Sequence, residues 1–241
     1  MNLYLVGFGP GHEKGMTIEA REAIENSDVI VGYTVYVELI KKFFPEKRYE
    51  STPMRRETER VELALRLSES GENVAIICSG DSVLYGMAGL AYELAVNYKN
   101  VDIKVIPGVT AALSGSAVLG APLTHDFCVI SLSDLLTPWE LIEKRLECAA
   151  MADFEIAIYN PSSKKRSDYL KKACDVLLKY RDENTVCGYV ENIGREGQQS
   201  NVLTLKELKD TEVNMFTTVF VGNSQTKNIH GMMVTPRGYK I

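Results

Sequence analysis

The sequence predicts an α/β protein with two domains, each made of strands and helices that alternate along the chain. Short runs of apolar and β-branched residues, such as residues 3–7 and 73–78, are typical of strands that are buried on both faces. Between such runs lie segments with apolar residues at helical spacing. Residues 120–123 read as a linker, so we expect domains at 1–120 and 121–241. Two such units favour a binding site in the cleft between them.

The first domain is expected to contain four strands with helices between them. The first strand ends in a cluster of glycines, and the next helix begins only near Thr17. Pro45 ends the helix that starts at Val35, because proline does not continue a helix. We expect strands at residues 3–7, 29–31, 73–78 and 101–106, and helices from about 17, at 35–44, 56–67, 83–98 and 109–119.

The second domain is expected to contain five strands. At residues 137–140, Thr-Pro-Trp-Glu combines an N-cap threonine, a proline at the first helical position and the glutamate of a capping box. Thr204 and Glu207 repeat the capping-box spacing for a short helix. We expect strands at residues 127–132, 154–159, 185–190, 199–205 and 216–222, and helices at 137–150, 167–180 and from 204.

One turn of the first domain has the position of a ligand-binding loop. Ser79, Gly80, Asp81 and Ser82 follow a predicted strand, and open α/β sheets bind ligands at the carboxyl ends of their strands. Gly80 lets a ligand approach the backbone, and Asp81 or Ser82 is available to cap the following helix. An ordinary strand–turn–helix connection explains the same pattern.

The glycines after the first strand do not form a nucleotide-binding fingerprint. A dinucleotide site needs its third glycine inside a helix that starts at once, and an acidic residue that ends the second strand. Here a loop follows Gly11, and Asp28 precedes the second strand. The Gly-Lys-Ser/Thr sequence of a phosphate-binding loop is absent as well.

Composition and charge indicate which partners, metal sites and cellular compartment to expect. A net charge of −5 argues against nucleic acid as the main partner, because duplex binding usually requires a basic excess. The five cysteines and three histidines lack the spacing of metal ligands, so we expect no metal site. The most apolar stretch, residues 105–123, is broken by proline, glycine and serine, which disfavours a membrane span. Residues 1–6 carry no secretion signal, and we expect a cytoplasmic protein.

Four motifs are shared with a known enzyme family. They are Gly9-Pro10-Gly11, Ser79-Gly80-Asp81, Pro107-Gly108-Val109-Thr110-Ala111 and Gly120-Ala121-Pro122-Leu123-Thr124-His125. On these motifs the chain resembles the tetrapyrrole methylases over nearly its whole length. The resemblance implies a homodimeric enzyme of two α/β domains with the active site between them. It also implies S-adenosylmethionine as the methyl donor and S-adenosylhomocysteine as its product.

A second set of motifs is specific to one branch of this family. The set comprises Gly32-Tyr33, residues 125–128 and 130–140, Tyr159-Asn160-Pro161, and residues 192–195 and 221–224. It resembles the branch that methylates carbon 17 of precorrin-3B or cobalt-precorrin-3 in cobalamin biosynthesis. This implies a tetrapyrrole (precorrin) substrate and contraction of its ring to (cobalt-)precorrin-4. The motifs leave open whether the substrate carries cobalt.

The resemblance further implies a cofactor site made of backbone groups and small side chains. S-adenosylmethionine carries a sulfonium cation, a carboxylate, an ammonium group and an adenine, so it needs no phosphate-binding loop. The implied cofactor-binding residues are Pro10, Ser79, Gly80, Asp81, Leu84, Thr110, Ala111, Asn160, Gly188, Thr217 and Thr218.

Candidates for proton transfer and substrate binding follow from side-chain chemistry. His125 and Asp126 lie near the expected domain junction, and histidine titrates close to neutrality, so they are the catalytic candidates. A hydrogen bond from His125 to the linker is the alternative. The guanidinium groups of Arg55, Arg56 and Arg60 match the carboxylate arms of the substrate, although a solvated helix face is the alternative, more so for Arg60 than for Arg55. The substrate-binding candidates are Tyr33, Arg55, Arg56 and Tyr85, with the basic residues 164–166 as a further cluster.

Two other classes of function remain open. One is a sister enzyme that methylates another corrin carbon, or a diphthamide or ribosomal-RNA methylase of the same family. The acidic net charge and residues 131–140 argue against this class. The other is a nucleotide-binding α/β protein such as a dehydrogenase, which the absent fingerprint opposes.

Overall fold

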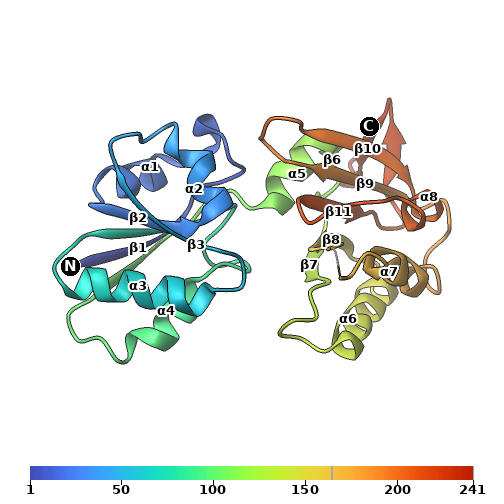
Figure 1. The fold of residues 1–241 in the computed structure, drawn as a ribbon. Helices are drawn as coiled ribbons and strands as arrows, with labels where there is room; N and C mark the ends of the chain where they lie inside the picture. The colour runs from blue at the N-terminus through green and yellow to red at the C-terminus, as the bar shows by residue number, and fades with distance from the viewer. Residues whose placement is uncertain (164, 241) are drawn as a thin grey trace. The chain divides into compact units, whose positions relative to one another are not determined.

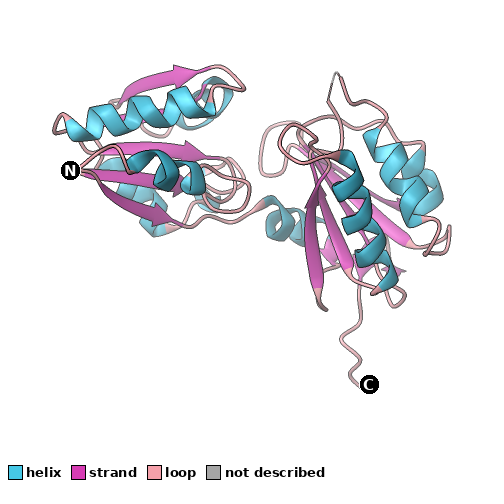
Figure 2. Cartoon of the chain, turned by 90° about the horizontal axis from the view of Figure 1, so that it is seen from below, coloured by secondary structure: helices cyan, strands magenta, loops and turns pink. Residues whose placement is uncertain are grey.

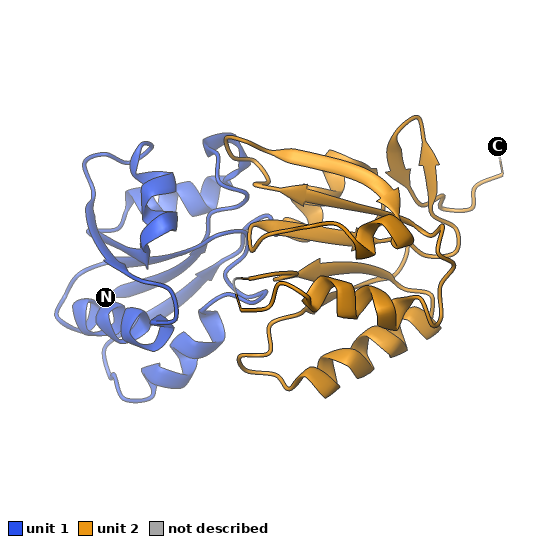
Figure 3. Cartoon of the chain, turned by 45° about the vertical axis from the view of Figure 1, so that its right-hand side comes forward, with its two compact units in different colours: residues 1–110 blue, residues 111–241 orange. Residues whose placement is uncertain are grey.

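The computed structural model of the chain describes residues 1–163 and 165–240, which form two compact units (Figure 3). Unit 1 is Met1–Thr110, and unit 2 begins at Ala111. The boundary therefore precedes the helix at residues 111–119, whereas the sequence places it after residue 120. The reason is packing, because this helix lies against the sheet of unit 2. Among the described residues no helix has the length and apolar character needed to cross a bilayer.

Unit 1 is a parallel sheet with helices on both faces (Figure 1). The strand order is β3-β2-β4-β1-β5, and all four pairings are parallel. Alternate residues of β4 point to opposite faces: Ala75 and Ile77 pack with α1 and α2, and Val74 and Ile76 pack with α3 and α4. The strands are β1 (Asn2–Gly7), β2 (Val29–Tyr33), β3 (Arg48–Thr52), β4 (Val74–Cys78) and β5 (Asp102–Ile106). The helices are η1 (Glu13–Gly15), α1 (Ile18–Glu25), α2 (Thr34–Lys41), α3 (Glu57–Glu69) and α4 (Ala88–Ala95).

Four of these strands are predicted by the sequence, and the edge strand β3 is not. Its residues are charged or polar except Tyr49, and none of them is fully buried. At this edge of the sheet the strand is polar and partly exposed, so it lacks the apolar run that identifies β4.

Unit 2 is built on a mixed sheet in the order β10-β9-β11-β8-β7, in which only β7 and β8 pair in parallel. Helices α6, α7 and α8 cover one face, and α5 covers the other (Figure 2). A second small sheet, β12-β13-β6, joins the C-terminal hairpin to the linker. The strands are β6 (Gly120–Ala121), β7 (Phe127–Ser131), β8 (Glu155–Tyr159), β9 (Val186–Glu191), β10 (Gln199–Thr204), β11 (Thr217–Val221), β12 (Lys227–Ile229) and β13 (Met232–Val234). The helices are α5 (Ala111–Leu119), α6 (Trp139–Met151), α7 (Tyr169–Leu177) and α8 (Leu205–Lys209).

Close packing explains the small residues of α5. A Cβ atom added to Gly115 would lie 2.8 Å from the ring of Phe220 in β11, and one added to Gly188 of β9 would lie 2.8 Å from Leu119. Side chains at these positions would separate the helix from the sheet, since contacts below 3 Å are not tolerated.

The two predicted capping boxes have different outcomes. That of α8 is confirmed: Thr204 Oγ1 accepts a hydrogen bond from the Glu207 N–H, and Glu207 Oε2 accepts one from the Thr204 N–H. The prediction for α6 is wrong, because Pro138 is the N-cap and no side chain caps this end. The helix begins one residue later than expected, which moves the glutamate out of capping-box register.

Candidate active site

Three loops of unit 1 meet at the carboxyl edge of its sheet. Strands β4, β1 and β5 are neighbours and parallel, so the segments that follow them leave the sheet side by side. Gly9 and Gly80 join two of these loops by a pair of backbone hydrogen bonds, with N···O distances of 3.0 and 2.8 Å. This edge is where open parallel sheets bind their ligands.

Glycines allow the three backbones to come into contact. A Cβ atom on Gly108 would lie 2.2 Å from the carbonyl oxygen of Gly80 and 2.3 Å from that of Gly7. A Cβ atom on Gly7 would lie 2.7 Å from the nitrogen of Gly108. The loops after β1, β4 and β5 thus form one assembly of main chain, with no room for a side chain at these points.

Asp81 holds this assembly together through backbone amides. Its Oδ1 atom accepts hydrogen bonds from the N–H groups of Val83 and Leu84, both at 2.8 Å, and its Oδ2 atom accepts one from Gly108 at 3.0 Å. Burial raises the pKa of the Asp81 carboxyl, but these backbone donors together with Ser82 outweigh it and hold the pKa below its ordinary value. Asp81 is therefore a carboxylate at neutral pH.

The segment between Asp81 and α4 is a loop, which corrects the expected helix start. The helix begins at Ala88 with Met87 as its N-cap, so neither Asp81 nor Ser82 caps it. The Ser82 hydroxyl instead donates to the carbonyl oxygen of Ile106 at 3.0 Å, and Tyr85 adopts a left-handed backbone with φ 55°. A helix cannot include this conformation, and the loop projects Val83 and Tyr85 into solvent.

Six predicted cofactor-binding residues lie in these three loops. The loop segments 7–11, 79–84 and 107–110 contain no lysine or arginine, and Asp81 is their one charged residue. Loops of this composition suit a ligand that carries a positive charge and forms hydrogen bonds with the main chain. They lack the lysine and arginine side chains that bind a phosphate group. No group of three metal-ligating side chains is formed by the described residues. The six residues are Pro10, Ser79, Gly80, Asp81, Leu84 and Thr110.

The other predicted cofactor-binding residues belong to unit 2. Asn160 follows β8, and its Nδ2 atom donates to Ser131 Oγ at the end of β7 across 2.9 Å. Thr217 and Thr218 begin the antiparallel strand β11, so they lie at this same end of the sheet, and both are buried. Gly188 lies farther along, opposite Phe220 and beneath Leu119. Ala111 is the first residue of α5.

The structure places the catalytic candidates at the opposite end of the unit 2 sheet. His125 and Asp126 precede β7, whereas Ser131 is its last residue and Asn160 follows β8. The His125 Nε2 atom lies 2.9 Å from the carbonyl oxygen of Pro236 in the C-terminal segment. A strand of five residues separates the two ends by about 13 Å. His125 thus contacts the C-terminal segment, and it lies away from the predicted cofactor-binding residues Asn160, Thr217 and Thr218 of unit 2.

The four substrate-binding candidates lie at the carboxyl edge of unit 1. Tyr33 ends β2, Arg55 and Arg56 follow β3, and Tyr85 follows β4, and these three strands are adjacent. Arg55 is exposed with φ 67°, and Arg56 is exposed and paired with Glu59.

Two further arginines differ from expectation. Arg60, a carboxylate-binding candidate with a solvated helix face as the alternative, is only 3% exposed, so the alternative is wrong. Sequence spacing offers a weak signal for this, because Arg60 directly precedes the buried Val61 on α3. In the cluster 164–166, Lys164 lies outside the described residues. Arg166 forms an ion pair with Asp134 at 3.2 Å and donates to Ser133 Oγ at 2.8 Å, so it holds the loop after β7.

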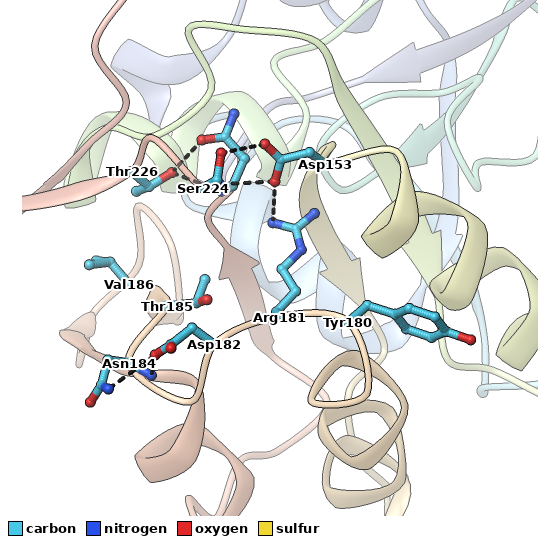
Figure 4. Close-up of a pocket in the computed structure, with 10 residues that line it drawn as sticks. Asp153, Tyr180, Arg181, Asp182, Asn184, Thr185, Val186, Ser224 and Thr226 are labelled. Atoms are coloured by element: carbon cyan, nitrogen blue, oxygen red, sulfur yellow. Dashed lines mark hydrogen bonds and ion pairs between the residues drawn. The ribbon is translucent and has the colours of Figure 1, made fainter.

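A pocket of about 330 Å³ opens at the His125 end of unit 2, away from Asn160 (Figure 4). Arg181 in its wall points toward Asp153, at 3.6 Å, and donates to the carbonyl oxygens of Phe154 and Gly222. This arginine ties together the segments around β8 and β11. None of the predicted site residues lines the pocket.

Comparison with known proteins places these features in context. Residues 2–209 match the family described as Tetrapyrrole (Corrin/Porphyrin) Methylases. The probable cobalt-factor III C(17)-methyltransferase of Salmonella typhimurium is 45% identical, over 99% of this chain and 100% of its own. The cobalt-factor III methyltransferase of Priestia megaterium is 46% identical over 99% of this chain, which spans only 45% of that longer protein.

Two more distant matches agree with these. The precorrin-3B C(17)-methyltransferase of a Sinorhizobium species is 35% identical, over 98% of this chain and 96% of its own. The crystal structure of the methyltransferase CobJ is 33% identical and superposes with a TM-score of 0.89, covering 98% of each chain.

Proposed function

The chain belongs to the tetrapyrrole (corrin/porphyrin) methylase family, and from this premise we propose that it transfers a methyl group from S-adenosylmethionine to carbon 17 of cobalt-factor III. The observation that carries the proposal is the relative from Salmonella typhimurium, which matches over the full length of both chains and bears that activity in its name. The reaction belongs to cobalamin biosynthesis.

Sequence identity favours a substrate that already carries cobalt. Four relatives named for cobalt-factor III are 38 to 46% identical to this chain, whereas the relative named for precorrin-3B is 35% identical. A cobalt ion would enter with the substrate as part of the macrocycle.

The loops of unit 1 are proposed to hold the methyl donor. When bound, S-adenosylmethionine supplies a methyl group on a sulfonium cation, which is reactive without further activation. The Asp81 carboxylate keeps Val83, Leu84 and Gly108 in one arrangement and gives the loops a negative charge that suits the cation. Backbone groups beside Pro10, Ser79 and Thr110 complete the site.

Residues of unit 2 are also proposed to bind the cofactor. Ala111, Asn160, Thr217 and Thr218 present short polar or small groups, and Gly188 offers backbone without a side chain. Tyr33, Arg55, Arg56 and Tyr85 are proposed to contact the substrate. Holding the donor carbon and the acceptor carbon in line supplies roughly 7–11 kcal/mol toward such a transfer. We propose a homodimer, as expected from the family.

The proposal is tested by incubating the protein with S-adenosylmethionine and either cobalt-factor III or precorrin-3B, followed by mass spectrometry. We expect a product heavier by one methyl group with cobalt-factor III, formed faster than with precorrin-3B. An isotopically labelled methyl group then locates the modified carbon by NMR. Methylation at a carbon other than 17 would identify a sister enzyme, and no methylation of either compound would refute the proposal.

A further inference from the structure

Arg60 is a buried cation at the edge of unit 1 where the substrate candidates lie. It extends from α3 beneath the ends of β2 and β3 and is 3% exposed. Its guanidinium carbon lies 6.0 Å from the ring centre of Tyr33, and its Nη1 atom lies 3.5 Å from the sulfur of Met87. Tyr33 and Met87, which contact the guanidinium group, are only half-buried.

The hydrogen bonds of Arg60 leave its charge without a counter-ion. Nη2 donates to the carbonyl oxygens of Pro53 at 3.1 Å and Thr52 at 3.4 Å, while Nε has no partner. Within the described part of the chain, no aspartate or glutamate forms an ion pair with Arg60. Burial lowers the pKa of Arg60, and the charge of Glu57 offsets this effect only in part.

A second buried polar atom without a partner belongs to a residue that contacts this cation. The hydroxyl oxygen of Thr52, whose own carbonyl Arg60 contacts, is buried and makes no hydrogen bond among the described residues. Arg181, the other buried arginine, differs because it is paired with Asp153. An unpaired buried cation beside an unpaired hydroxyl is costly for folding alone, and an anion with a hydrogen-bonding oxygen would satisfy both groups.

We propose that Arg60 and Thr52 bind one carboxylate arm of the tetrapyrrole substrate. The inference rests on the proposed function, because it takes the substrate to be a polycarboxylate macrocycle. The guanidinium supplies the charge and Nε–H, and the Thr52 hydroxyl donates a second hydrogen bond. Tyr33 and Met87 are the side chains that move to admit the arm. The exposed Arg55 and Arg56 would meet arms in water, where an ion pair contributes little, whereas Arg60 acts in a low-dielectric setting.

The test compares the affinity of each variant for cobalt-factor III and for its methyl ester, whose arms are uncharged. Calorimetry with wild-type protein, R60M, T52V and the control R66M gives the ratio of the two affinities. Arg66 lies on the same helix and its side chain is 58% exposed, so R66M should leave the ratio unchanged. We expect R60M to reduce the preference for the free acid about tenfold or more, and T52V to reduce it several-fold. S-adenosylhomocysteine affinity should stay within about twofold of wild type in all three variants.

The outcomes separate this inference from the function itself. If R60M loses affinity equally for the acid and the ester, Arg60 only stabilises the turn between β3 and α3. That result would overturn the inference. T52V decides the matter should R60M fail to fold, because valine removes only an unpartnered hydroxyl and suits a strand. An unchanged ratio in T52V then overturns the inference. If wild-type protein binds cobalt-factor III in neither form, the proposed function fails instead.

Discussion

The carboxylate of Asp81 accepts a hydrogen bond from the backbone N–H of Gly108 across 3.0 Å, although 27 residues separate them in the chain. The same carboxylate accepts the N–H groups of Val83 and Leu84. One side chain therefore fixes the loop after β4 to the loop after β5. The geometry of the proposed cofactor site depends on this link.

Replacing Asp81 with asparagine should weaken cofactor binding. The amide group keeps one acceptor oxygen, but its NH₂ group cannot accept the remaining backbone N–H bonds. We expect S-adenosylhomocysteine affinity in D81N to fall about tenfold, the size of one charge-assisted hydrogen bond. Calorimetry measures this, with D102N on the exposed part of β5 as the control. Equal affinities of D81N and wild type would show that the link does not shape the site.

Acid should remove the stabilisation that Asp81 provides. Its folded-state pKa is below the ordinary value, because backbone donors outweigh burial. The contribution is therefore complete above the unfolded-state pKa of about 4 and is lost as pH falls through the lower folded-state pKa. The difference in unfolding temperature between wild type and D81N should be constant from about pH 8 to 5 and should shrink below about pH 4. A difference that grows on acidification would contradict this assignment.

Gly108 should not tolerate alanine, whereas Gly89 should. The added Cβ of G108A would lie 2.2 Å from the Gly80 carbonyl oxygen, so the loops must separate. We expect a loss of about 1–3 kcal/mol in the free energy of unfolding, with weaker S-adenosylhomocysteine binding. Gly89 is in α4 with nothing within 4 Å of an added Cβ, so G89A should gain up to about 1 kcal/mol. Denaturant unfolding of both variants measures the two signs, and a stable G108A would refute the packing argument.

Arg55 offers a case in which stability and binding should change in opposite directions. Its left-handed backbone, φ 67°, costs about 1 kcal/mol for a non-glycine residue and is free of strain in glycine. We expect R55G to unfold at a higher temperature but to bind cobalt-factor III less tightly, because an exposed cation is lost. Cofactor binding should be unchanged. Undiminished tetrapyrrole affinity would remove Arg55 from the substrate site.

Glu155 should destabilise the protein as pH rises. It is 1% exposed, and neither carboxyl oxygen has a hydrogen-bond partner among the described residues. Burial raises the pKa of Glu155. Stability is therefore lost as pH rises from the ordinary pKa through the raised one. We expect E155Q to match wild type near pH 4 and to exceed its unfolding temperature near pH 7. Parallel thermal curves at all pH values would contradict a raised pKa.

Local sequence patterns predicted most strands and the turn that follows β4. The apolar run at Val74–Cys78 can only be buried on both faces, and the glycine and aspartate that follow it mark a turn at the carboxyl edge. The predicted start of α4 was wrong because Asp81 does not cap the helix. Its carboxylate instead accepts a hydrogen bond from the loop after β5, and β1 lies between β5 and β4 in the sheet. The prediction of a capping box for α6 was wrong because Pro138 is the N-cap, which leaves Thr137 outside the helix.

The sequence by itself determined the strand–helix alternation, the glycine-rich turns and the family, because each of these depends on residues that are close together in the chain. Only the tertiary structure decided which residues share an edge. It buried Arg60 without a counter-ion and paired Arg166 with Asp134. It also placed His125 next to Pro236, at one end of the unit 2 sheet, whereas Asn160 lies at the other end. Burial and charge pairing depend on contacts between segments that are distant in the chain, and local sequence does not encode those contacts directly.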